Sequence, residues 1–402
     1  MVLIPSGREL LANDDSRITS KVFLVFMKIL NYTATAVFVF LIFYLLFIGK
    51  DLLLPLVIAI ALWYLIITLG NAFARIRIGS FSLPRKLCII ASFLTFIASI
   101  WVILDFLSST VDDVLEVAPV YQENLTTRLE SFTFFDITQF EGQSFGQLLS
   151  GWINIPSYAA SIASSLTSVL ASGGLILIYL GFLFLEQGHF SKKISALVTN
   201  KEKEENVNKI IARIRDDIQK YITIKVFTSS LTGLLSFTFL RIMDVDFAGV
   251  WGLIIFLLNF IPTVGSIIAT IFPALIALAQ SDGYTLFFIV LGGIGVVQLC
   301  IGNILEPRLM GSSFNLSPIV ILLNLALWGY VWEIPGMFLC VPFLIIVTII
   351  LSHFPQTRPI AIILSSDGRL RVPINKTIAP FSFSPSAASL PSPNADESKQ
   401  KS

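Results

Sequence analysis

Residues 247–281 read FAGVWGLIIFLLNFIPTVGSIIATIFPALIALAQS and contain no charged residue. A run of this length and apolarity is typical of a segment inside a lipid bilayer. Its middle is interrupted by Pro262 and Gly265, and Pro273 follows. A helix break frees backbone N–H and C=O groups that lipid cannot satisfy, so it persists only where protein or a water-filled cavity covers it. The stretch therefore indicates a transport or permeation site rather than a simple membrane anchor.

The composition predicts an all-α polytopic integral membrane protein. The chain has 402 residues, of which 55% are hydrophobic and 13% are charged, against roughly 25% charged residues in an average soluble domain. The net charge of +1 argues against a nucleic-acid-binding surface. The three cysteines and two histidines form no disulfide framework and no metal-ligand spacing. We therefore expect no metal and no cofactor.

Uncharged runs bounded by charged residues predict about six full transmembrane helices. The runs cover residues 29–49, 52–74, 87–104, 164–185, 221–240 and 283–305. Each is close to the 17–25 residues that cross roughly 30 Å of hydrocarbon. Lys225 lies one turn inside the fifth run, and we expect its long side chain to extend toward the membrane surface.

Two further apolar regions, residues 247–280 and 314–352, are divided by helix breakers. A 15-residue arm of the first region would be about 22 Å long, which is short of a full crossing. We expect two broken helical hairpins that enter and leave the membrane on the same side, and four short tilted spans are the alternative. The expected break and hinge residues are Pro262, Gly265, Pro273, Pro307, Gly311, Pro318, Gly329, Pro335, Gly336 and Pro342.

Basic residues predict the orientation and the organisation of the chain. The 73–86 loop carries four basic residues and no acid, which predicts a cytoplasmic position and places both termini in the cytoplasm. The expected regions are a cytoplasmic N-terminus (1–28), three transmembrane helices (29–107), an extracytoplasmic amphipathic helical segment (108–163), a fourth transmembrane helix (164–187), a charged cytoplasmic helix (188–220), the transport core (221–352), a short cytoplasmic β-hairpin (353–376) and a disordered Ser/Pro-rich tail (377–402).

Two polar segments have an apolar stripe at helical spacing. In the outer one, Val111, Val114, Leu115 and Ala118 begin the stripe, which predicts packing against the chain's own bundle, a neighbouring subunit or the membrane surface. The inner stripe comprises Val207, Ile210, Ile211, Ile214, Ile218 and Tyr221. No helix breaker lies between 204 and 239, so we expect the inner helix to continue into the fifth span.

The sequence contains no enzyme constellation and no phosphate-cradling loop. Polar residues at membrane depth are therefore the candidate functional residues, because broken helices supply dipoles and free carbonyls beside them. The expected substrate-path residues are Asn259, Thr263, Ser266, Gln298, Asn303, Glu306, Asn324 and Glu333. The alternatives are that Asn259 caps the broken helix, that Glu306 pairs with Arg308, and that Glu333 marks a water-exposed hairpin tip.

The same segments resemble a known family. They are Val245-Asp246-Phe247-Ala248, Asn259-Phe260-Ile261-Pro262-Thr263-Val264-Gly265-Ser266, Pro273, Leu305-Glu306-Pro307 with Met310-Gly311, Leu316-Ser317-Pro318, Gly329, Pro335-Gly336 and Val341-Pro342. Together with the order of spans, they resemble the autoinducer-2 exporter family of bacterial transporters over roughly residues 20–365. The tail after Thr377 is not a feature of that family.

The resemblance implies a multi-pass protein of the bacterial inner membrane that associates with copies of itself. The family takes its name from export of a furanosyl quorum-sensing signal, and other members are linked to sodium/proton exchange. We therefore expect a secondary transporter or exporter of a small polar solute, with the lipid bilayer and a small molecule or ion as partners. A Na+(Li+)/H+ antiporter, and a membrane scaffold without transport activity, are the alternatives.

Overall fold

The computed structural model describes residues 7–75, 84–130, 173–187, 201–311 and 315–370, together with the single positions 157, 189, 193, 195 and 196. The tail after Thr377 and most of the outer segment beyond residue 130 lie outside this part of the chain. The fold is an all-α polytopic membrane protein, as the sequence predicted. Among the described residues, β-type pairing is limited to one antiparallel bridge between Leu316 and Ser365.

Six helical stretches in the described part of the chain are long and apolar enough to cross a membrane, although the last of them is divided by a break at Trp332 and Glu333. Their spans are Ile29–Ile48, Lys50–Ala74, Lys86–Thr110, Glu204–Ile242, Thr285–Met310 and Pro318–His353. The helices that contain the first four are α1 (Gly7–Ile48), α2 (Lys50–Arg75), α3 (Arg85–Glu130) and α6 (Lys201–Ile242). The expected fourth span starts outside the described residues, and Gly173–Gln187 forms a shorter apolar helix.

The described part of the outer amphipathic segment, residues 108–130, is a continuation of the third span, because α3 remains helical through Pro119. It lies against the chain's own bundle, which was one of the three expected positions. The Asn124 side chain donates to the Ala279 carbonyl at 3.1 Å, and Arg128 pairs with Asp282 at 3.1 Å. These contacts fix the outer end of α3 against the turn that follows α8 (Val264–Gln280).

Tyr121 fixes the same part of α3 to the connection between α6 and α7, through a hydrogen bond from its phenol to the Asp246 carboxylate. Burial, followed by that hydrogen bond, raises the pKa of the Tyr121 phenol above its usual value near 10. The phenol therefore remains a donor over the whole physiological pH range.

The first hairpin consists of α7 (Ala248–Leu258) and α8, separated by a non-helical break. Thr263 has φ 60° and ψ -60°, a positive-φ conformation that is strained for a β-branched residue. The chain turns back so tightly that a Cβ added at Gly265 would overlap the carbonyl oxygen of Leu258. Both helices contribute to one buried cluster through Ile255 and Ala269. The break therefore reverses the chain inside the bundle.

The second hairpin lies within α11 (Pro318–His353), where Trp332 and Glu333 have non-helical backbone angles. The Asn324 side chain donates to the Cys340 carbonyl at 2.6 Å, although the two residues are 16 positions apart. In a straight helix they would be about 24 Å apart, so the two arms of α11 fold back on each other. As at Gly265, a Cβ at Gly336 would overlap a carbonyl oxygen of the first arm.

The charged inner helix continues without a break into the fifth span, as predicted, and forms α6 with it. Ile210 and Ile214 from its apolar stripe pack against a cluster built around Trp328 and Trp332 of α11. On the charged side, Lys209 pairs with Glu205 at 2.7 Å. The stripe therefore serves packing within the chain.

One sequence prediction was wrong at the C-terminal end. The β-hairpin expected over residues 353–376 requires a first strand over 360–364, but these residues belong to a helix, α12 (Arg358–Leu364), in which Pro359 occupies the first turn. Proline is pre-organised for that position, and its missing N–H would be unpaired there in any case. The second strand of that hairpin, expected over 369–374, lies mostly outside the described residues.

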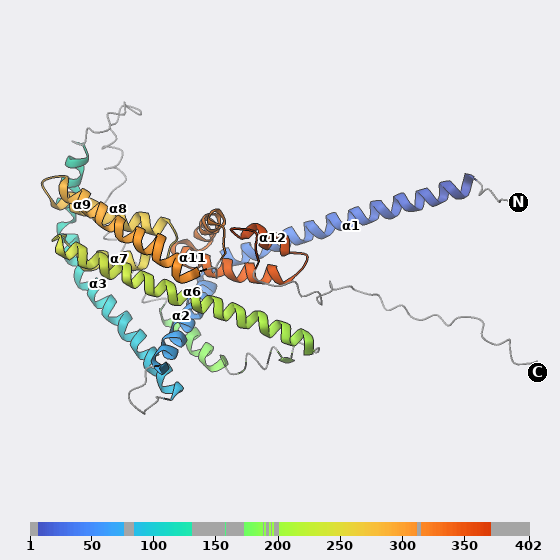
Figure 1. Cartoon of the computed structure of the whole chain (residues 1–402), viewed down its shortest axis with the longest axis horizontal. Helices are drawn as coiled ribbons and strands as arrows, with labels where there is room; N and C mark the ends of the chain where they lie inside the picture. Colours follow the sequence, from blue (N-terminus) through green and yellow to red (C-terminus); the bar gives the residue numbers. More distant parts are fainter. Residues whose placement is uncertain are drawn as a thin grey trace, which may run out of the picture.

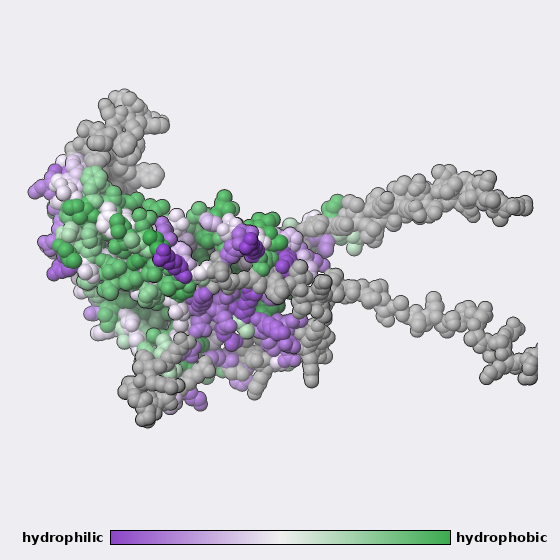
Figure 2. Space-filling view, in the orientation of Figure 1, coloured by the Kyte–Doolittle hydropathy of each residue, from purple (hydrophilic) through white to green (hydrophobic). Residues whose placement is uncertain are grey.

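Figure 1 shows how these elements are arranged. Helix α6 crosses the molecule beside α7, α8 lies beside α9 (Thr285–Gln298), and the N-terminal half of α1 extends away from the other helices. Figure 2 shows apolar surface over the α7–α9 side and hydrophilic surface over the N-terminal half of α6. In the apolar part of α1, Ile29–Ile48, none of the residues in the most hydrophobic window is buried within the chain. That helix therefore presents its apolar surface to lipid or to another protein.

We predict that Gly265→Ala strongly destabilises the protein, because the new Cβ would overlap the Leu258 carbonyl oxygen. The expected cost is about 3 kcal/mol, seen as a lower unfolding temperature in detergent. The control is Gly292→Ala, because a Cβ at Gly292 meets nothing within 4 Å. Equal unfolding temperatures for the two variants would contradict the close contact at the break.

We also predict a pH-dependent effect of Tyr121→Phe. The phenol pKa is raised in the folded state, so the hydrogen bond contributes stability below pH about 10 and loses it as the pH rises further. The difference in unfolding temperature between wild type and Tyr121→Phe should be constant from pH 7 to 9 and shrink above pH 10. Tyr330→Phe is the control, because Tyr330 is 78% exposed.

Candidate functional site

A pocket of about 550 Å³ lies between α6, the break of the first hairpin and the span that contains α9. Six of the eight residues proposed from the sequence line it: Asn259, Thr263, Ser266, Gln298, Asn303 and Glu306. Its other lining residues are Lys225, Pro262, Ile267, Thr270, Ile271, Gly295, Leu299 and Gly302. A volume in this range suits a small organic molecule.

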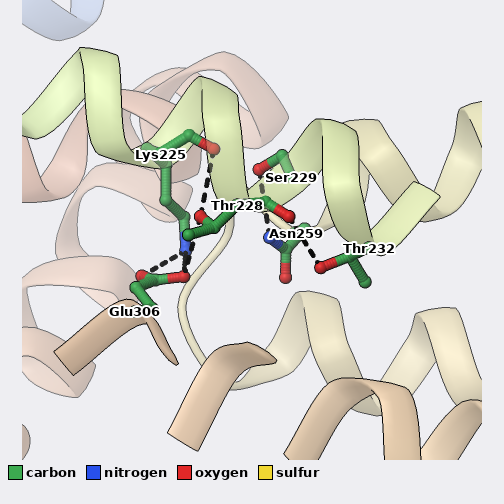
Figure 3. A network of polar contacts seen from close by, with 6 residues as sticks. All are labelled: Lys225, Thr228, Ser229, Thr232, Asn259 and Glu306. Carbon is green, nitrogen blue, oxygen red and sulfur yellow. Dashed lines mark hydrogen bonds and ion pairs between the residues drawn. The ribbon is translucent and has the colours of Figure 1, made fainter. Parts of the chain in front are cut away.

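The strongest electrostatic contact at the pocket joins Lys225 of α6 to Glu306. The Lys225 ammonium lies 2.7 Å and 3.0 Å from the two carboxylate oxygens, and Figure 3 shows the pair. The side chains are only 7% and 14% exposed. The expectation that Lys225 extends to the membrane surface was therefore wrong, because a buried carboxylate offers it a partner inside the bundle. Glu306 likewise pairs with Lys225, and not with Arg308.

A row of hydroxyl groups extends from this ion pair along α6. Thr228 lies within hydrogen-bond distance of a Glu306 oxygen, at 3.2 Å, and Thr232 donates to the Thr228 carbonyl at 2.8 Å. Ser229 accepts a hydrogen bond of 3.0 Å from the Asn259 amide, which comes from the end of α7 (Figure 3). The Asn259 side chain therefore ties the hairpin to α6, and Asn259 is also the C-cap residue of α7, which agrees with the alternative that it caps the broken helix.

The break places the N-terminus of α8 at the pocket. Thr263 and Ser266 lie there, and neither hydroxyl caps the helix in the described contacts, since the N-cap makes no side-chain hydrogen bond. A helix N-terminus carries a partial positive charge from its unpaired N–H groups. The pocket therefore combines hydroxyl and amide groups with one compensated pair of charges.

The opposite wall is formed where α9 changes into a π-helical segment, η1 (Leu299–Leu305), followed by α10 (Glu306–Met310). Gln298 and Glu306 flank this segment. Residues eight apart on a regular α-helix are rotated by about 80° from each other, and the wider π-helical turn reduces that offset. Both residues can therefore face the same pocket. Such π-helical insertions are frequent at functional sites.

The two remaining candidates lie away from the pocket. Asn324 bonds to the Cys340 carbonyl and holds the arms of α11 together. Glu333 is at the tip of that hairpin, where it pairs with Lys50 at 3.3 Å and its side chain is 76% exposed. The alternative of a water-exposed tip therefore describes Glu333 better than a place in the substrate path.

Sequence reasoning missed Lys225 as a pocket residue, and it missed the row of hydroxyl groups that extends from Lys225 along α6. The signal was present, because Lys225, Thr228, Ser229, Thr232 and Ser236 recur at the spacing of one helix face inside an apolar run. All five are buried in the fold. What the sequence lacked was the position of Glu306, 81 residues away.

Comparisons with known proteins agree with the architecture. Residues 8–356 match the family described as AI-2E family transporter. The chain is 29% identical to the AI-2 transport protein TqsA of Escherichia coli over 322 residues, which cover 79% of this chain and 90% of TqsA. It is 27% identical to a putative transport protein of Borreliella burgdorferi, over 77% of this chain and 83% of that protein. A putative transport protein of Haemophilus influenzae is 31% identical over 52% and 60% of the two chains.

A double-mutant cycle should separate the buried ion pair from an ordinary surface pair. Lys225→Met or Glu306→Gln alone leaves an uncompensated charge in a largely buried site, and each should cost about 3 kcal/mol. The double variant should cost much less than the sum of the two. Unfolding in detergent measures each value.

The matched control is the exposed pair of Lys50 and Glu333, for which Lys50→Met and Glu333→Gln should each change stability by less than about 1 kcal/mol. Simple additivity of the two changes at Lys225 and Glu306 would show that the two groups do not interact.

Proposed function

The chain belongs to the AI-2E transporter family, and we propose that it moves a small polar solute across the bacterial inner membrane through the pocket beside the first hairpin. It is a multi-pass membrane protein with several apolar helices. The observation that supports the proposal most directly is the pocket of about 550 Å³ at the Pro262 break. Polar groups inside a membrane-spanning bundle are energetically costly unless they contact each other, water or a solute.

The proposed path uses Asn259, Thr263, Ser266, Gln298, Asn303 and Glu306. Asn324 and Glu333 have structural roles in this scheme. Movement of the first hairpin relative to α6 would open the pocket alternately to the two sides of the membrane. Thr263, at the break of this hairpin, is the natural hinge because it already adopts a strained backbone conformation with positive φ. Transport would then be driven by a solute or ion gradient.

For the cargo, we propose autoinducer-2 or a related small polar molecule, moved outward. The support is the name of the relative TqsA, an AI-2 transport protein. A cation/proton antiporter remains the second candidate, and the buried carboxylate of Glu306 is the observation that favours it. Such a mechanism requires Glu306 to release Lys225 whenever it binds a proton or a cation. A scaffold role without transport would leave the pocket without a purpose.

We also propose the membrane orientation and the assembly. The basic loop 73–86 lies on the cytoplasmic side with both termini, by the positive-inside rule. The exposed apolar surface of α1, which includes Phe38 and Phe40 at 62% and 70% exposure, would contact lipid and neighbouring copies. An oligomer of identical subunits is therefore part of the proposal.

Efflux from proteoliposomes loaded with autoinducer-2 tests the function. We expect protein-dependent efflux in a cysteine-free background, and its loss by at least about 10-fold when Asn303→Cys is modified by a charged, membrane-impermeant thiol reagent. Asn303 is exposed at the pocket, so the added group would obstruct the path without disturbing a packed core. Glu333→Cys is the control, since it lies at the exposed hairpin tip and should be modified without loss of efflux.

The same vesicles distinguish the rival mechanism. Imposed sodium and proton gradients, followed with a pH-sensitive dye, would reveal exchange that disappears in Glu306→Gln if the protein is an antiporter. Absence of autoinducer-2 efflux together with such exchange would replace the exporter proposal by the antiporter. Absence of both would favour the scaffold.

A further inference from the structure

Gln298 is a buried amide without a hydrogen-bond partner. The residue is only 8% exposed and lines the pocket. Within the described part of the chain, neither its amide oxygen nor its amide nitrogen makes a hydrogen bond. Native proteins pair nearly all such groups, and an exception calls for an explanation. The neighbouring polar residue Asn259 is paired, with Ser229.

The position of Gln298 offers that explanation. It is the last residue of α9, directly before the π-helical segment that leads to Glu306. Because its amide forms no hydrogen bond, turning the side chain into the cavity breaks none. A primary amide presents an acceptor and a donor side by side, so its natural partner has a donor and an acceptor on adjacent atoms.

The charges of the pocket narrow the choice of ligand. Among the described residues that line it, Lys225 and Glu306 are the charged ones, and they compensate each other at 2.7 Å. A cation or an anion held here would leave a net charge in a site of low polarity, which is unfavourable. The volume of about 550 Å³ is also far larger than a bare metal ion requires.

We infer that Gln298 selects the cargo, and that the cargo is an uncharged solute with adjacent hydrogen-bonding groups, such as neighbouring hydroxyls. This inference rests on the proposed function and adds the residue and the charge class of the ligand. The Lys225–Glu306 pair stays closed in the loaded state and keeps the pocket neutral. Gln298 hydrogen-bonds the solute, and selectivity arises because a charged analogue would have to break the pair or remain uncompensated.

The test compares Gln298→Met with Gln280→Met. Methionine keeps the length of the side chain and removes both amide groups. Gln280 is the matched control because both of its amide atoms are used, at 3.0 Å to the Asp246 N–H and at 2.7 Å to the Asp244 carbonyl. Without ligand, Gln298→Met should raise the unfolding temperature by about 2 °C or more, and Gln280→Met should lower it. A lower unfolding temperature for Gln298→Met would mean that the amide serves the fold, and would overturn the inference.

Ligand binding is then measured on the full-length protein in detergent by the shift in unfolding temperature. The probes are D-ribose and erythritol as uncharged solutes, D-ribose 5-phosphate as a charged analogue, and Na+. We expect the uncharged probes alone to stabilise the wild type, and Gln298→Met to weaken that binding at least 10-fold. Stabilisation by the phosphate or by Na+, or by none of the probes, would overturn the inference.

The outcome of this binding experiment is independent of the outcome of the transport assay. Binding that depends on Gln298 but is accompanied by no efflux would contradict the proposed function alone. Efflux of autoinducer-2 that is unchanged in Gln298→Met would contradict this inference alone.

Discussion

A polypeptide that reverses direction inside a membrane must bring its two arms together without leaving backbone groups exposed to lipid. Here both reversals meet that constraint in the same way. At Gly265 and at Gly336, the chain after the break passes so close to a carbonyl of the first arm that no Cβ fits between them. The strained residues Thr263 and Glu333 make the turns. The pocket lies at the first of these turns, where the chain folds back between α7 and α8 instead of continuing as one straight helix.

The buried ion pair gives the pocket its electrostatic character. Lys225 comes from the middle of α6 and Glu306 from the end of the span that starts at Thr285, so the pair joins two long helices beside the hairpin. Either charge alone would be strongly unfavourable at that depth, whereas the two together leave a neutral wall. In the proposed path, amides and hydroxyls would then select the solute, which is chemistry suited to a small polar molecule.

The contacts outside the pocket suggest which parts move together. The end of α3 contacts the end of α8 and the turn that follows it, through Asn124 and Arg128. Trp332 donates to the Leu46 carbonyl at 3.0 Å, which holds the second hairpin against α1. The surface pair of Lys50 and Glu333 adds little stability because water screens it. A rearrangement of the first hairpin would therefore carry the outer part of α3 with it.

The sequence alone determined the membrane class, the two broken hairpins and six of the pocket residues, because apolar run length, Pro and Gly are local signals that lipid makes decisive. The same local signals misjudged Lys225, the partner of Glu306 and the segment 360–364. Only the tertiary structure decided these, because a charge in an apolar run can reach the surface or meet a partner 81 residues away, and both choices have the same local sequence. The unpaired amide of Gln298 is likewise a property of its surroundings, which no sequence pattern records.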